Sequence, residues 1–216
     1  MRSHIFLPAR SLWEWKWLQS RGTHTVVMAM IQTATKQVRW TISDLEGFPD
    51  NGNRYEIIDG ELFVTRSPHW NHQNAAGRIY TQLSLWSQQS GLGQAVMTPG
   101  IIFSDSDNVI PDVVWISNQR LADLLDDAGH LTGAPELIVE VLSKTEKDKQ
   151  RDRKTKLKLY SAQGVQEYWI VDYQQQQIEV YRRNQGILER VLTLFATDQL
   201  TSPLLPEFCC LVGSLF

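Results

Sequence analysis

The sequence of 216 residues has only two cysteines and no long apolar run, and each shortage excludes a class of protein. Cys209 and Cys210 are adjacent, and neighbouring cysteines rarely bond to each other or match the ligand spacing of a zinc site. We therefore expect neither a disulfide framework nor a cysteine-held metal, and we predict a reducing, cytoplasmic location. No apolar run is long enough to span a membrane, and the N-terminus lacks the apolar core of a signal peptide, so we expect no membrane segment.

The sequence also lacks an excess of positive charge, since its net charge is −3 and its pI about 6.0. A protein that coats nucleic acid without specificity is normally basic, so that class is disfavoured. Neither a helix-turn-helix nor a zinc finger is visible. Lysine and arginine are nevertheless concentrated between Lys144 and Lys158, a segment that contains eight of them and only three acids. This segment is either a local basic surface or an ordinary solvated helix.

The rest of the chain is organised around residues 135–172, where two short apolar runs flank a charged segment of helix length. This pattern predicts a strand, a crossover helix and a second, parallel strand. Parallel strands are covered on both faces and are normally apolar throughout. Glu140 lies in the middle of the first run, and a buried carboxylate is costly unless it meets a cation, a metal or a hydrogen-bond donor.

The predicted crossover helix carries polar residues at four-residue intervals, namely Asp148, Asp152, Lys156 and Tyr160. In an α-helix these side chains lie near one face. A lysine on that face could return to the strand of Glu140, where an ammonium group could orient a water molecule or stabilise a phosphate. On this stretch alone, a solvated helix with i,i+4 ion pairs is the simpler interpretation.

A second acid interrupts another apolar run, from Val109 to Ile116. Asp112 directly follows Pro111, and a proline in a strand marks an edge or a bulge. One buried acid could be a structural accident. Two acids on separate strands are hard to bury except together with a cation.

The remaining elements are simpler to predict. Residues 54–64 form a hairpin about Asp59-Gly60, and a helix runs from about Trp70 to Ser90. His69 and His72, at the start of this helix, are too few to indicate a metal, and a cap or a surface position is the simpler interpretation. Residues 1–35 have no clear period, and we expect an N-terminal extension that is either upstream of the native start codon or not packed, with one domain over 36–216.

Several short motifs occur in order along the chain: YEIIDGEL, Ser67-Pro68 followed by His72, PDVVWI, PELIVEVLS, the helix of Asp152, Lys156 and Tyr160, and GVQEYWIVD. As an ordered set they resemble the Uma-type family of restriction-endonuclease-like proteins, which share the PD-(D/E)xK signature. The resemblance runs from about Trp40 to the C-terminus. It implies a mixed α/β fold, with a mixed sheet flanked by helices and an N-terminal hairpin.

The resemblance also implies an active site. Asp112 and Glu140 would bind Mg²⁺ or Mn²⁺ together with the carbonyl of Val141. The signature places a lysine two residues after the second acid, where this chain has Leu142, and in the family that lysine is taken to have moved to the following helix, here to Lys156. Glu56 would be an additional acid in the same pocket, and it is taken from the resemblance alone.

The function implied is that of a Mg²⁺-dependent endonuclease that hydrolyses phosphodiester bonds of DNA. A homodimer is compatible with it, because many enzymes that cut duplex DNA pair two sites. Leu142 and the acidic pI leave an alternative, a non-catalytic module that binds nucleic acid or protein on the same fold. A third interpretation places the acids in a buried ion-pair network with lysine and arginine.

Overall fold

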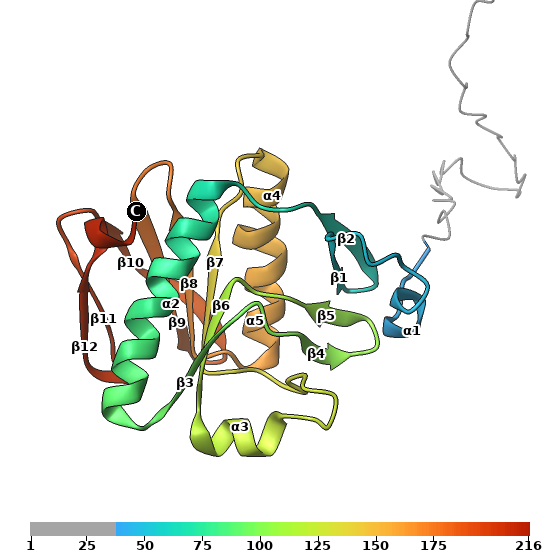
Figure 1. The fold of residues 1–216 in the computed structure, drawn as a ribbon, viewed down its shortest axis with the longest axis horizontal. Coiled ribbons are helices and arrows are strands. Elements are labelled where there is room, and N and C mark those ends of the chain that lie inside the picture. The colour runs from blue at the N-terminus through green and yellow to red at the C-terminus, as the bar shows by residue number, and fades with distance from the viewer. Residues whose placement is uncertain (1–37) are drawn as a thin grey trace, which may run out of the picture. The chain divides into compact units, whose positions relative to one another are not determined.

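The structure is a computed structural model that describes residues 38–216 (Figure 1). The expected N-terminal extension lies outside the described residues. The described elements comprise two main sheets, a small hairpin and helices on both faces of the larger sheet. None of the helices in 38–216 is both long and apolar enough to cross a lipid bilayer.

The larger sheet has six strands in the order β10-β9-β8-β7-β6-β3. Its members are β3 (Gly93–Met97), β6 (Val113–Ser117), β7 (Leu137–Val141), β8 (Glu167–Asp172), β9 (Gln177–Asn184) and β10 (Ile187–Phe195). β7 and β8 are parallel, as their sequence predicts, and the other neighbours are antiparallel. The expected mixed sheet is therefore confirmed.

The smaller sheet has four strands in the order β2-β1-β5-β4 and contains the predicted hairpin. Its members are β1 (Arg54–Ile58), β2 (Glu61–Thr65), β4 (Ile101–Ser104) and β5 (Asp107–Val109). Asp59 and Gly60 both have positive φ, which the two-residue turn between β1 and β2 requires. A short helix, α1 (Ile42–Leu45), precedes this sheet, and the Thr41 N–H donates to the Asp44 carboxylate in a capping box.

Helices cover both faces of the larger sheet. On one face lies α2 (Trp70–Ser90), whose Ala75, Ala76, Ile79 and Leu83 pack against the sheet together with the hairpin of β11 (Gln199–Ser202) and β12 (Leu205–Leu211). The C-terminal turn, Val212–Leu215, packs against the same cluster. A short helix, α3 (Asn118–Leu124), follows β6.

The other face is covered by the crossover helix between β7 and β8. It consists of α4 (Glu146–Gln150), a π-helical turn (Arg151–Lys156) and α5 (Leu157–Gln163), so its centre is not the regular α-helix that the sequence predicts. π-helical turns are rare and often lie at functional sites. Asp152, Lys156 and Tyr160 are buried beneath this helix.

One residue of the predicted polar face, Asp148, differs from the other three in burial. Asp148 is partly exposed, because it belongs to the helix cap: Thr145 Oγ1 donates to its carboxylate at 2.6 Å, and its own N–H donates back to Thr145 Oγ1. Of the four residues predicted to lie near one face, Asp152, Lys156 and Tyr160 are therefore buried, whereas Asp148 is not.

The run from Val109 to Ile116 is not one strand. β5 ends at Val109 in the smaller sheet, and β6 begins at Val113 in the larger one. Pro111 interrupts the pairing as predicted, but the chain also changes sheet there. Asp112 is thus not at mid-strand; it lies at the point where the two sheets meet.

Candidate active site

A polar pocket lies between the two sheets and the crossover helix. Its charged or ionisable lining residues come from five parts of the chain: Arg54 and Glu56 on β1, His72 on α2, Asp112 before β6, Glu140 on β7, and Arg151, Asp152 and Lys156 in the π-helical turn. Four carboxylates and three permanent cations therefore meet in a space that admits little water.

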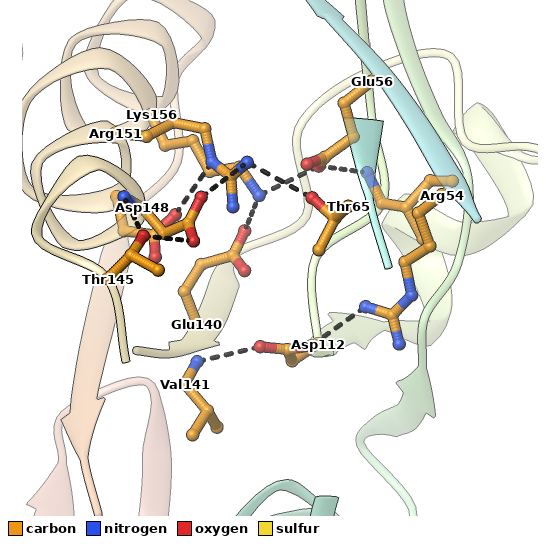
Figure 2. Close-up of polar contacts among 12 residues, drawn as sticks. Arg54, Glu56, Thr65, Asp112, Glu140, Val141, Thr145, Asp148, Arg151 and Lys156 are labelled. Carbon is orange, nitrogen blue, oxygen red and sulfur yellow. Dashed lines mark hydrogen bonds and ion pairs between the residues drawn. The ribbon is translucent and has the colours of Figure 1, made fainter. Parts of the chain in front are cut away.

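Lys156 is at the centre of these contacts. Its Nζ atom lies 2.8 Å from Oε1 of Glu140 and 2.9 Å from Oε1 of Glu56, and all three side chains are buried (Figure 2). Burial alone would lower the pKa of Lys156, but the negative charges of Glu140, Glu56 and Asp152 reverse this and hold it above its usual range. Lys156 is therefore charged at neutral pH.

The charge of the Glu140 carboxylate is less well compensated by its surroundings than that of the Lys156 ammonium group. Its Oε1 atom accepts hydrogen bonds from Lys156 and from the Tyr160 hydroxyl, each at 2.8 Å. Burial raises the pKa of Glu140 to about 8; Lys156 opposes this shift, while Asp112, Asp152 and Glu56 add to it. The pocket thus disfavours a negative charge at Glu140 unless more positive charge is supplied.

The surroundings of Asp112, unlike those of Glu140, favour its negative charge. Its Oδ2 atom accepts the Val141 N–H at 2.9 Å and lies 3.2 Å from His72 Nε2, and its Oδ1 atom accepts from Arg54 at 3.1 Å. Burial alone would raise the pKa of Asp112, but His72, the Val141 N–H and Arg54 together lower it to about 2. Asp112 is therefore an ionised carboxylate, held next to the end of β7.

Leu142 occupies the position where the signature has a lysine. Its side chain is buried, and it belongs to the apolar cluster between the larger sheet and α5. Lys144, the other lysine close to the end of β7, is exposed. The ammonium group in the pocket is instead that of Lys156, which the crossover helix delivers.

The residues present fit a divalent cation in charge and chemistry. Oδ1 of Asp152 is buried without a hydrogen-bond partner, and its nearest cationic atom is Arg151 Nε at 3.6 Å. Burial raises the pKa of Asp152 to about 6, although Lys156 and Arg151 oppose the shift. Hard cations prefer carboxylate and carbonyl oxygens. Within 38–216, however, no three His, Cys, Asp or Glu side chains already enclose a metal position, and Lys156 stands between Glu56 and Glu140.

The structure brings together all four predicted side chains, Glu56, Asp112, Glu140 and Lys156, with Val141 beside them. Sequence reasoning did not assign Arg54, His72, Arg151 or Asp152 to the site. His72 was interpreted as a cap or surface residue, whereas the N-cap is His69, which accepts the Asn71 N–H. For His72 the only signal was its place in the ordered motifs. For Asp152 it was the four-residue spacing to Lys156.

Comparison with known proteins agrees with this architecture. The family model Uma2, described as "putative restriction endonuclease", matches residues 42–213. Among solved structures, a protein from Anabaena variabilis described as a putative nuclease belonging to DUF820 is similar, with a TM-score of 0.65 and 18% sequence identity over 82% of this chain and 97% of that one. At that identity the likeness shows the fold. No curated protein matches the chain.

Proposed function

The chain belongs to the Uma2 family, and from that premise we propose that it is a Mg²⁺- or Mn²⁺-dependent endonuclease that hydrolyses phosphodiester bonds of DNA. One observation carries the proposal: the crossover helix places the ammonium group of Lys156 2.8 Å from Glu140, in the pocket that also holds Asp112. This supplies the acid, acid and lysine set of the PD-(D/E)xK signature although the usual lysine position is Leu142.

The metal would be held by Asp112, Glu140 and the carbonyl of Val141. Bound there, it would polarise a phosphoryl oxygen and lower the pKa of a coordinated water. Asp112 suits this role because its low pKa keeps it ionised over the whole physiological range. The elevated pKa of Glu140 indicates a site where an added cation would be strongly favoured.

The chain's own residues would position the reactants. The Val141 N–H fixes one oxygen of Asp112, so that this carboxylate does not need to reorganise during the reaction. Lys156 would orient the attacking water or stabilise the charge that develops on the phosphate. Glu56 would hold Lys156 in place, since its Oε1 atom forms an ion pair with Nζ and is itself fixed by the Ile110 N–H, which donates to it at 2.9 Å.

A second candidate rests on the same contacts. Lys156 already bridges Glu56 and Glu140, and Asp112 already has three partners. A buried network of this kind could be purely structural, in a non-catalytic module that binds nucleic acid or protein. The two candidates differ in their response to metal.

The test is thermal melting with and without Mn²⁺ on the wild type, on Glu140→Ala and on Glu189→Ala, whose acid is exposed on β10. A ligand at a hundred times its Kd stabilises the folded state by about 2.7 kcal/mol. We expect a rise in melting temperature in the wild type and in Glu189→Ala, and none in Glu140→Ala. Mn²⁺-dependent cleavage of DNA should then be lost in Glu140→Ala. If Mn²⁺ leaves the wild type unchanged while Glu140→Ala is strongly destabilised, the pocket is a structural network and the enzyme proposal is wrong.

A further inference from the structure

An aromatic surface lies beside the pocket, and the proposed chemistry does not use it. Trp70, the first residue of α2, is 82% exposed, more than any other large apolar residue in 38–216. Single exposed apolar residues are common, but tryptophan is rarely left this open. The residues two positions before and after it are part of the pocket, because Pro68 and His72 both line it.

His69, which is exposed, directly precedes Trp70, and its ring lies against Tyr173, a partly buried side chain that packs on the core. The rings of His69 and Tyr173 are nearly parallel, with 6.2 Å between their centroids and 6° between their planes. Tyr173 directly follows β8, and Ser143, which lines the pocket, directly follows Leu142 at the end of β7. Val141 pairs with Val171 in the parallel register, so Ser143 and Tyr173 leave the sheet at the same end.

The charge around this surface suits a phosphate backbone. Arg66 and Lys144 are exposed, and among the described residues neither forms an ion pair. From residue 66 to residue 77 the sequence has no acid. In Figure 1 the start of α2 and the start of α4 lie at the same end of the larger sheet. Arg66 precedes α2 by four residues and Lys144 precedes α4 by two, so both cations belong to segments that reach this end.

Exposed rings next to unpaired cations are the combination by which proteins hold single-stranded nucleic acid. A base offers a ring face whatever its sequence, and each stacked base contributes to affinity, whereas in a continuous duplex the faces are already stacked on each other. We propose that Trp70, with the exposed ring of His69 beside it, stacks on an unpaired base of the strand whose phosphate enters the pocket. The substrate class is therefore DNA with a single-stranded segment at the cleavage position.

This inference rests on the proposed function for the identity of the ligand, but its test does not require catalysis. Binding of the full chain to a labelled single strand of about 12 nucleotides, within the span of known single-strand sites, is measured by fluorescence anisotropy beside the same sequence as duplex. Ca²⁺, which takes the same oxygen ligands, is present in place of Mg²⁺. We expect the single strand to bind more tightly than the duplex.

Trp70→Ala should weaken single-strand binding by about 5- to 150-fold, the loss that corresponds to one stacked base, and should leave duplex binding unchanged. Trp70→Phe should retain most of the affinity because it keeps a ring. The control is Leu85→Ala, which removes another exposed side chain from the same helix, 50% exposed, and should change nothing. Circular dichroism would show that each variant is folded.

The outcomes separate this inference from the proposed function. If the wild type binds duplex as tightly as single strand, binds neither, or is insensitive to Trp70→Ala, the inference is wrong, even if the protein cleaves DNA with Mn²⁺. A Trp70 that instead serves a protein partner would give this result. If single-strand binding depends on Trp70 but no metal-dependent cleavage occurs, Trp70 is a binding site for single-stranded DNA and the catalytic proposal fails.

Discussion

Nζ of Lys156 lies 2.8 Å from Oε1 of Glu140, although the two residues are 16 positions apart. The contact joins a π-helical turn to the middle of a buried parallel strand. It puts an ammonium group beside Glu140. In the PD-(D/E)xK signature the lysine lies two residues after this acid on the same strand. Four predictions follow from this relationship and its neighbours.

Lys156→Met should destabilise the protein by about 3–5 kcal/mol, because it leaves the buried carboxylates of Glu140 and Glu56 without their shared cation. Urea denaturation measures this change. Lys158→Met removes an exposed lysine two residues away and should change the free energy of unfolding by less than about 0.5 kcal/mol. Equal, small effects of the two substitutions would show that the Lys156 contacts do not stabilise the fold.

Leu142 should behave only as a packing residue, despite its place in the signature. Leu142→Ala is expected to cost about 2–5 kcal/mol through the cavity that it leaves in the core. Leu142→Met should cost less than about 1.5 kcal/mol. Melting with and without Mn²⁺ should show the same metal-dependent rise in Leu142→Met as in the wild type. Loss of that rise in the conservative variant would assign Leu142 a direct part in the site.

The stability of the protein should depend on pH through Glu140. Its pKa rises from 4.5 in the unfolded chain to about 8 in the fold, so between these values the folded state binds the extra proton. The free energy of unfolding therefore falls as pH rises across this window. Asp152, with a pKa of about 6, acts in the same direction at lower pH. Asp112, with a pKa of about 2, acts oppositely, and its contribution is lost only in strong acid.

Urea denaturation at about pH 5 and about pH 8 tests this dependence. Between these two pH values the free energy of unfolding should fall more in the wild type than in Glu140→Gln, because the glutamine has no proton to release. Glu189→Gln, at an exposed position, should lose as much as the wild type. A Glu140→Gln protein with the wild-type slope would contradict the assignment.

Asp112→Asn should separate metal binding from folding. An asparagine can still accept the Val141 N–H through its side-chain oxygen, so we expect a modest loss of stability, of about 1–3 kcal/mol. It carries no charge, so the Mn²⁺-dependent rise in melting temperature should disappear. Asp112→Ala should also lose the rise but be less stable, because it leaves Arg54 and the Val141 N–H without their acceptor. A full Mn²⁺ response in Asp112→Asn would exclude Asp112 as a ligand.

Local pattern was sufficient for much of the fold. The hairpin about Asp59-Gly60, the helix Trp70–Ser90 and the parallel pair on either side of the crossover helix all occur as predicted. These features depend on turn chemistry and on the periodicity of apolar residues, which neighbouring residues determine. Asp112 and Glu140 could likewise be selected from the sequence, because each is an acid within an apolar run and a buried charge is costly unless it is paired.

The sequence by itself therefore determined the family, the mixed sheet and the two acids whose burial needs an explanation. Only the tertiary structure decided which groups meet them. Arg54 and His72 reach Asp112 from a hairpin and a helix that are distant in the chain, and no local rule distinguishes them from surface residues. The π-helical turn that buries Lys156 is also absent from the local pattern, since regular four-residue spacing predicts an unbroken α-helix. Charge pairing depends on distance in space, and packing of the two sheets fixes that distance.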